Sequence, residues 1–447
     1  MNSLKRSLTF NDILMLAFST MIGWGWVSLA GSWSASGGMA GASIAFVLGA
    51  VLCIFVGLTY CELISIFPYA GGEIVFSYNA IGYHAAWLTG WMTAFAYVGV
   101  AAWEGAALAT AIDYLVEIPR KGYLFTVAGF EVYFSWLIIP AVTGSVLIFI
   151  NFRGIKVSAV FQKVVTILLV LGGIIFAAVG TLKGDIANAM PLITDTKGVF
   201  MVVLAVPAMF VGFDVIPQAT EEMDLPIRKI PGAIIISICL AALWYILMII
   251  TASFAAPASV LTGEGLSVIN AVNYVTLYPL VGKLIIISAI MGILSSWNGF
   301  LIGATRVLYA MGKYNMLPSF FGSLHKKYNT PFFATLFVGA ITIFTPVLGR
   351  NSLQWFVRAS SFGTVITYFM VALSFVVMRY RFPDRERPFK LRHGLFVGYM
   401  AIVISLFFIV LYLPFGSSSL TGTEWTIVAA WVFIGVILYT CSMGRHN

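Results

Sequence analysis

The stretch FSTMIGWGWVSLAGSW, residues 18–33, places two glycines around a tryptophan in the middle of an apolar run. An apolar run of about 20 residues is long enough to cross a bilayer as a helix. Glycine is unfavourable there, because it costs roughly 1 kcal/mol per residue in a helix interior. The stretch therefore indicates either a notch for close helix packing or a membrane helix that is interrupted at Gly23 and Gly25.

The composition is that of an integral membrane protein. Of the 447 residues 60% are hydrophobic and 9% are charged, whereas about 25% are charged in soluble domains. The backbone must satisfy its own hydrogen bonds in lipid, and the apolar runs are too long for barrel strands. We expect an all-α fold with twelve transmembrane helices, at residues 12–34, 40–66, 84–112, 131–150, 157–181, 199–219, 232–256, 280–312, 332–348, 357–378, 395–413 and 425–443.

The connections between these runs predict the domain organisation and the orientation. No Ser-rich or Pro-rich linker divides the chain, so residues 1–447 are expected to form one domain. Most Lys and Arg residues of the short loops fall on one side, which predicts that both termini are cytoplasmic. The net charge of +8 is explained by this asymmetry and by contact with anionic lipid headgroups, without a nucleic-acid partner. The loop at 257–279 is apolar enough to contain a short helix.

The start of the chain resembles a secretory signal, because basic residues precede an apolar run that ends in small residues. Thr9 and Asp12 instead have the spacing of a capping box. Because eleven further spans are predicted, we expect the first helix to be retained and to begin at this box.

A second disturbed span lies five spans after the first. Residues 207–217 contain Pro207, Gly212, Asp214 and Pro217, and proline costs about 3 kcal/mol in a helix interior. Interrupted segments at corresponding positions of two halves are typical of inverted-repeat transporters with a site at the midplane. The pattern predicts repeats at 12–181 and 199–378, with discontinuous first and sixth helices, followed by two helices at 395–443.

A broken helix has a definite chemistry. Free amides at the start of a half-helix attract a carboxylate, and free carbonyls at the end of the preceding half-helix attract an ammonium group. Two adjacent breaks therefore suit a zwitterion, so an amino acid fits better than a sugar or a lone ion.

Ionisable and aromatic side chains at membrane depth are further candidates. A charge at the centre of a membrane helix is costly, so Glu104 and Asp214 are functional candidates. Glu104 is interpreted either as a substrate or proton-coupling group or as a neutral structural carboxyl, and Asp214 either as a site residue or as a tie for the unwound segment. Aromatic residues that line the site or simply pack are Trp24, Trp26, Trp103, Phe210, Phe213 and Trp297.

Five motifs resemble those of the amino acid, polyamine and organocation (APC) permease superfamily, whose members have the LeuT-like fold of five plus five inverted helices. They are MIGWGWV (21–27), YCELISIFPYAGGEIVFSYNAIG (60–82), FVGFDVIPQATEEMDLPIRKIP (210–231), TRVLYAMGKYNMLP (305–318) and MRYRFPDRERPFK (378–390). The resemblance covers nearly the whole chain in order.

The resemblance implies roles for particular residues. The substrate carboxylate is expected at main-chain amides of Ile22, Gly23, Trp24 and Gly25, and the amine at main-chain atoms of Phe210, Val211 and Gly212. It further implies that Phe213 is a gate, and that Trp297 and either Ser360 or Ser361 border the pocket.

One departure from the family concerns ion coupling. Many members carry a lysine in the fifth helix that substitutes for a sodium ion, and the aligned position here is Leu169. A sodium site formed by Ser19, Ile22, Ser295 and Ser296 is one replacement. The alternative is that these hydroxyls bond back to their own helices.

We therefore expect a secondary active transporter of a small neutral amino acid, working by alternating access in the cytoplasmic membrane. The alternatives are a transporter of an amine such as a polyamine or ethanolamine, an amino acid exchanger, or a channel or sensor with the same fold. An enzyme is not expected. No cofactor is predicted, with sodium or protons as candidate coupling ions, and the expected partners are the substrate and the bilayer, without an obligatory protein partner.

Overall fold

The computed structural model describes residues 4–276 and 278–443. The helices and strands of the first half are α1 (Phe10–Ile22), α2 (Gly25–Gly37), α3 (Met39–Ile66), α4 (Gly72–Ala80), α5 (Tyr83–Leu115), β1 (Tyr123–Val127), β2 (Phe130–Tyr133), α6 (Phe134–Arg153) and α7 (Ile155–Lys183). Those of the second half are α8 (Thr196–Met209), α9 (Val215–Gln218), α10 (Ile230–Ala255), α11 (Ala258–Leu261), α12 (Ser267–Val275), α13 (Pro279–Lys313), α14 (Phe332–Phe344), α15 (Gly349–Arg381), α16 (Gly394–Tyr412) and α17 (Gly422–Met443). Short 3-10 helices lie at Ile186–Ala189, Thr220–Glu222, Ile227–Lys229, Ser319–Gly322 and Thr345–Leu348.

The structure is a bundle of membrane-spanning helices, as the sequence predicts. Within the described residues 10 helices are long and apolar enough to cross a membrane, and the bent pair α1 and α2 raises the number to 11. The predicted span at 199–219 is divided between the short apolar helix α8 and the single turn α9. The fold is thus a multi-pass helical membrane protein, and the count of twelve spans stays a prediction.

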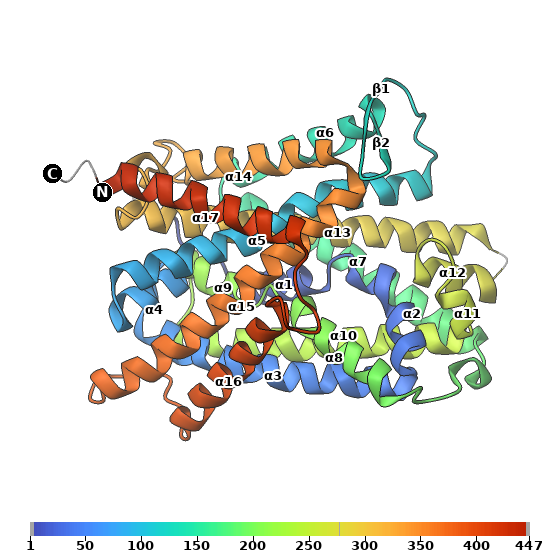
Figure 1. Cartoon of the computed structure of the whole chain (residues 1–447), viewed down its shortest axis with the longest axis horizontal. Helices are drawn as coiled ribbons and strands as arrows, with labels where there is room; N and C mark the ends of the chain where they lie inside the picture. The colour runs from blue at the N-terminus through green and yellow to red at the C-terminus, as the bar shows by residue number, and fades with distance from the viewer. Residues whose placement is uncertain (1–3, 277, 444–447) are drawn as a thin grey trace.

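Burial differs greatly among the helices. In the apolar 18-residue stretch of α5 that could cross the membrane, 83% of the residues are buried, whereas in that of α17 22% are buried. α5 packs against both α13 and α15, and α10 packs against α3 and α1. In Figure 1 the described ends of the chain lie together at the left end of the bundle, with the β1–β2 hairpin and helices α11 and α12 toward the opposite end. The inner helices therefore form a core and contact mainly other helices.

A short hairpin precedes α6 in the otherwise helical chain. Strands β1 and β2 pair antiparallel, with Tyr123 opposite Tyr133 and Val127 opposite Phe130. The predicted span at 131–150 began inside this hairpin, whereas α6 begins at Phe134. Aromatic and β-branched residues favour strands, and the turn residues Ala128 and Gly129 have positive φ angles of 49° and 75°, as a tight hairpin turn requires.

Two smaller expectations are confirmed. The Thr9 side chain accepts a hydrogen bond from the Asp12 amide, and the Asp12 carboxylate accepts one from the Thr9 amide, so the capping box starts α1. The loop at 257–279 contains the helices α11 and α12. The amide of Gly31 in α2 donates to the hydroxyl of Ser267 in α12, which fastens this loop to the second half of the broken first span.

A buried cluster of charged residues joins the end of α3 to the end of α15 and the loop that follows it. Glu62 of α3 is 1% exposed and accepts hydrogen bonds from Arg379 Nε at 3.0 Å and from the Leu391 amide at 2.8 Å. Arg387 Nε lies 3.1 Å from the same carboxylate. A buried carboxylate between two guanidinium groups is stable only while all partners are present. The cluster therefore holds the loop after α15 against the end of α3.

We expect the substitution Glu62→Ala to destabilise the protein by about 3–5 kcal/mol, because it leaves two guanidinium groups without their buried counter-charge. Thermal unfolding of the purified protein in detergent measures this effect. The matched control is Glu386→Ala, which removes an exposed carboxylate from the same loop and should shift stability by no more than about 0.5 kcal/mol. Equal unfolding temperatures for the two variants would contradict the assigned role of Glu62.

Candidate functional site

The first span is interrupted where the two glycines stand. α1 ends at Ile22, α2 begins at Gly25, and their axes differ by 51°. The carbonyl of Met21, in the last turn of α1, accepts a hydrogen bond of 2.8 Å from the hydroxyl of Tyr245 in α10. A side chain of a neighbouring helix thus satisfies main chain released by the break, as burial in a membrane protein requires.

The second interruption lies between α8 and α9. α8 ends at Met209, α9 begins at Val215, and Gly212 between them has a φ of +137°. Only glycine adopts this region without strain. The Asp214 carboxylate accepts a hydrogen bond of 2.8 Å from the Gly212 amide. One oxygen of Asp214 therefore ties the unwound segment, which is the structural role considered for it.

The two interruptions lie against each other. A Cβ atom added to Gly212 would lie 3.0 Å from the Met21 nitrogen at the end of α1. A Cβ atom added to Gly25 would lie 3.1 Å from the Met209 sulfur at the end of α8. Glycine thus permits a close approach of main chain to main chain at position 212, and of main chain to the Met209 and Tyr245 side chains at position 25. Segments about 190 residues apart in sequence therefore form one locus.

Glu104 is linked to the α1 break by the side chain of Ser296, which contacts both. Its side chain, 4% exposed in α5, accepts a hydrogen bond from the Ser296 hydroxyl of α13 through Oε1. Its other oxygen, Oε2, is buried and has no hydrogen-bond partner among the described residues. A Cβ atom on Gly23 would lie 2.9 Å from the Ser296 hydroxyl. A buried carboxyl with one unused oxygen therefore lies one side chain away from the α1 break.

Aromatic rings surround the unwound residues after α8. Phe210 is fully buried, with its ring centroid 6.4 Å from that of Tyr245. Phe213 is also fully buried and stacks on Tyr368 at 5.6 Å, with Tyr60 edge-on at 5.6 Å. Val211 between them is 7% exposed. The role of Phe213 as a gate stays a prediction.

The other predicted tryptophans are placed differently. Trp24 at the break is partly buried, whereas Trp26 is fully buried and packs edge-on against Trp244 of α10 at 5.6 Å. Trp103 packs in the cluster of Trp136 at the start of α6. Trp297 lies against Gly105 and Gly144, where Cβ atoms would come within 3.4 Å of its ring. Trp26, Trp103 and Trp297 thus pack on neighbouring helices, and their role as lining residues of the site stays a prediction.

Ser360 and Ser361 of α15 both bond back to the carbonyl of Val357, at 3.0 and 2.8 Å. Ser360 also lies against Gly99 of α5, because a Cβ atom there would come within 2.2 Å of the serine side chain. This contact is more than one helical turn from Glu104 along α5. The border role of either serine stays a prediction.

The residues of the predicted sodium site lie on neighbouring helices, and two of their hydroxyls also bond back to their own helices, Ser19 to the Met15 carbonyl at 2.6 Å and Ser295 to the Gly292 carbonyl at 2.8 Å. Ser295 of α13 donates a hydrogen bond of 3.0 Å to the carbonyl of Ser19 in α1. The side-chain amide of Gln162 in α7 donates to the Ser19 hydroxyl at 2.7 Å and to the Ser295 carbonyl at 3.0 Å. Ser296 bonds to Glu104, and Ile22 is the last residue of α1. These contacts link α1, α7 and α13, and sodium binding among them stays a prediction.

Leu169 lies where the family resemblance leads one to expect a lysine. It is fully buried in α7. A Cβ atom on Gly292 of α13 would lie 3.3 Å from Leu169 Cδ1 and 2.4 Å from the Gly23 carbonyl oxygen. An apolar side chain, rather than an ammonium group, therefore lies close to the broken end of α1.

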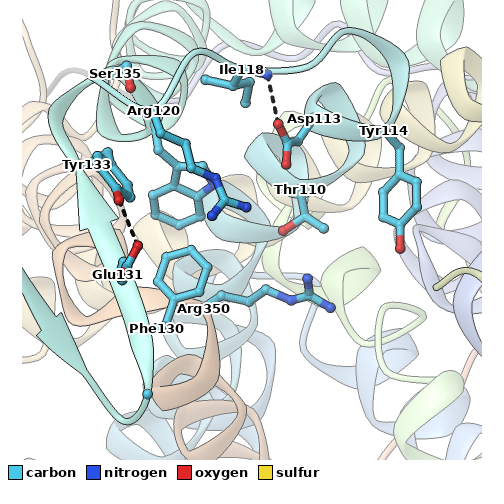
Figure 2. A pocket seen from close by; sticks show the side chains of 12 residues that line it. Thr110, Asp113, Tyr114, Ile118, Arg120, Phe130, Glu131, Tyr133, Ser135 and Arg350 are labelled. Atoms are coloured by element: carbon cyan, nitrogen blue, oxygen red, sulfur yellow. Dashed lines mark hydrogen bonds between the residues drawn. The ribbon is translucent and has the colours of Figure 1, made fainter. Parts of the chain in front are cut away.

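A cavity of about 530 Å³ lies away from the breaks, between the end of α5, the hairpin and the start of α15. Figure 2 shows Arg120 and Arg350 in it, with Asp113 bonded to the Ile118 amide and Glu131 accepting from Tyr133. None of the residues that line it belongs to the predicted site. The cavity is thus separate from the candidate site at the breaks.

Sequence reasoning missed three contributors to this locus. Tyr245 and Met209 close the space beside Gly25, but an aromatic or a methionine in an apolar helix carries no distinguishing pattern. Glu73 of α4 accepts a hydrogen bond from Gln218 of α9, directly after the second break. Its place in the motif PYAGGEIVF was visible, but the contact joins segments far apart in sequence.

Comparisons with known proteins agree with this architecture. The family model "Amino acid permease" matches residues 8–438. The branched-chain amino acid permease BcaP of Bacillus subtilis is 26% identical over 100% of this chain and 94% of its own length. The methylthioribose transporter of the same bacterium is 26% identical over 100% and 95%, and human cationic amino acid transporter 4 is 26% identical over 85% and 60%. These relatives are transporters rather than enzymes, as predicted, and the chain belongs to the amino acid permease family.

Proposed function

We propose that this permease is a secondary active transporter that moves a small neutral amino acid across the cytoplasmic membrane by alternating access. The observation that carries the proposal is the contact between the two helix interruptions, at Gly23–Trp24 and at residues 210–214. The substrate carboxylate binds the amides that begin α2, because the positive end of the helix dipole lies there. Main-chain atoms around Phe210, Val211 and Gly212 receive the ammonium group.

The orientation follows from the charged loops. The amides of Ser7 and Leu8 donate to the Glu222 carbonyl, so the described start of the chain lies at the same end of the bundle as the loop after α9. The loop after α15 carries Arg385, Arg387 and Lys390. Because cytoplasmic loops are enriched in Lys and Arg, we place both termini in the cytoplasm.

A second candidate substrate class is an amine without a carboxylate, such as a polyamine or ethanolamine. The unused Oε2 oxygen of the buried Glu104 favours it, since a buried carboxylate is a strong partner for an ammonium group. In this arrangement Glu104 binds the cation and the amides of α2 bind no ligand group. The names of the relatives, which include branched-chain and cationic amino acid transporters, support the amino acid as the first candidate.

We expect Gly25→Leu to abolish uptake without abolishing expression. Its side chain would enter the space that Met209 and Tyr245 border, because even a Cβ atom lies 3.1 Å from the Met209 sulfur. Uptake of a panel of labelled amino acids into proteoliposomes measures the effect. The matched control is Gly232→Leu, since a Cβ atom there meets nothing within 4 Å. Normal uptake by Gly25→Leu would exclude the broken-helix site.

The substrate class is decided by binding. For the amino acid, we expect thermal stabilisation of the purified protein by the free amino acid and none by its carboxyl-blocked amine, because the blocked compound lacks the negative charge that the start of α2 would attract. Equal stabilisation by the two compounds would overturn the amino acid in favour of the amine.

The variant Glu104→Gln tests whether the Glu104 carboxylate contributes to substrate binding. If the Glu104 carboxylate receives the ammonium group, its loss should weaken substrate binding by about tenfold or more, since a hydrogen bond to a charged group contributes about 1.5–3 kcal/mol. Scintillation proximity binding measures this loss. The exposed Glu117 at the end of α5 supplies the control Glu117→Gln, and equal affinities of the two variants would make Glu104 a structural carboxyl.

A further inference from the structure

A second buried carboxyl, Glu73, lies beside the α8–α9 interruption. It is fully buried in the first turn of α4, and its Oε2 accepts a hydrogen bond from the side-chain amide of Gln218 in α9. A Cβ atom on Gly72 would lie 2.5 Å from Pro217 Cβ, so the start of α4 packs directly on α9. Figure 1 shows α4 toward the end of the bundle where the chain begins. Glu73 therefore lies on the cytoplasmic side of the proposed substrate site.

The hydrogen bonding of this pair is incomplete. Glu73 Oε1 and Gln218 Oε1 are both buried acceptors without a partner in the part of the chain that the structure describes. An ionised carboxylate has no donor to offer, whereas a protonated one has one O–H. Leaving buried polar groups unpaired costs about 1–3 kcal/mol each. A proton on Glu73 thus supplies a donor for the pair, and the Tyr60 hydroxyl, which is buried without a partner in the described part of the chain, is a second donor beside it.

The groups that face Glu73 do not neutralise it by charge. Its neighbours include Tyr60 of α3 and Asp214 at the interruption. Tyr97 of α5 and Tyr368 of α15 also interact electrostatically with the Glu73 carboxyl. α13, which also packs against α4, carries Arg306, but this guanidinium forms two hydrogen bonds with Glu222, at 2.9 and 3.0 Å. Burial and the negative charge of Asp214 together raise the pKa of Glu73 to about 8.

This arrangement contrasts with the other buried carboxylates at the same end. Glu62 and Glu222 each have an arginine within 3.1 Å. For the described residues no ion pair includes Glu73 or Asp214. When a buried acid has no cation beside it, the favourable way to remove its charge is to bind a proton.

We propose that Glu73, with Gln218 as its hydrogen-bond partner, binds a proton and thereby couples substrate movement to proton movement. The coupling rests on the proposed transport function, whereas proton binding does not. The O–H bond of Glu73 forms when a proton is taken from water and breaks when it returns to water, so no other reactant is involved. Asp214 precedes α9 and Gln218 ends it, whereas Glu73 belongs to α4. Movement of the broken helix relative to α4 therefore changes the proton affinity of Glu73.

Infrared difference spectroscopy of the full-length protein in lipid, across a pH step that brackets about pH 8, tests proton binding. In the unmodified protein a carboxylic acid C=O band should disappear as pH rises through the pKa, and Glu73→Gln should lose this change. The control Glu264→Gln removes an exposed carboxylate between α11 and α12 and should keep it. Absence of the band change in the unmodified protein, or its persistence in Glu73→Gln, overturns the proposal.

A second variant protects this test against misfolding of Glu73→Gln. Asp214→Asn removes the neighbouring negative charge, so Glu73 should release its proton at a lower pH. The band change should therefore shift to lower pH by about one unit, as is typical when a buried charge neighbour is removed. An unchanged midpoint overturns the influence of the Asp214 charge on proton binding by Glu73.

Transport measurements separate the coupling from the proposed function. Proteoliposomes that enclose a pH-sensitive dye are supplied with an amino acid panel, and net uptake, counterflow and internal pH are recorded. We expect acidification during net uptake in the unmodified protein and its loss in Glu73→Gln. Net uptake without acidification overturns the coupling alone. Absence of counterflow for every amino acid overturns the transport function, while the infrared result still decides proton binding.

Discussion

The structure depends on how main-chain polar groups are satisfied where a membrane helix stops. Water does not reach the centre of a bundle to bond a free carbonyl or amide, so neighbouring side chains must do so. The Tyr245 hydroxyl bonds the Met21 carbonyl, the Ser295 hydroxyl bonds the Ser19 carbonyl, and Asp214 bonds the Gly212 amide. Each contact comes from another helix or from beyond the break. The interruption is therefore a property of the assembled bundle, because its neighbours supply the partners that the broken helix lacks.

Buried charge is treated in different ways at different places. Glu62 and Glu222 are paired with arginines near the ends of α15 and α13, where they join elements of the bundle. Glu104 has a single serine partner beside the α1 break, and Glu73 has the Gln218 amide near Asp214. A paired carboxylate is a structural tie, because removing either partner leaves a costly charge. A carboxyl that lacks a cation is free to bind one, or a proton, which is the basis for giving functional roles to the second group.

The candidate site was only partly predictable from residue patterns. The glycines and prolines could be recognised because their cost in a helix interior is large and local. The contribution of Tyr245 could not, since it depends on a hydroxyl reaching Met21 from a helix about 220 residues further along the chain. Trp26 was considered as an aromatic residue beside the break and Trp297 through the family resemblance, and each packs on a neighbouring helix. In an apolar helix the sequence does not distinguish a ring that lines a site from one that fills the core, because apolar residues occur on all faces of such a helix.

By itself the sequence determined the membrane environment, the approximate spans, the two interruptions and the family resemblance, because these depend on composition, run length and local helix cost. The β1–β2 hairpin was overlooked, since a short paired segment at the end of an apolar run is easily read as part of the helix. Tertiary structure alone decided that Gly212 lies against Met21, that Ser296 joins Glu104 to the α1 break, and that Glu73 meets Gln218 without a cation. Such contacts join distant segments, and their partners are selected by helix packing rather than by any local pattern.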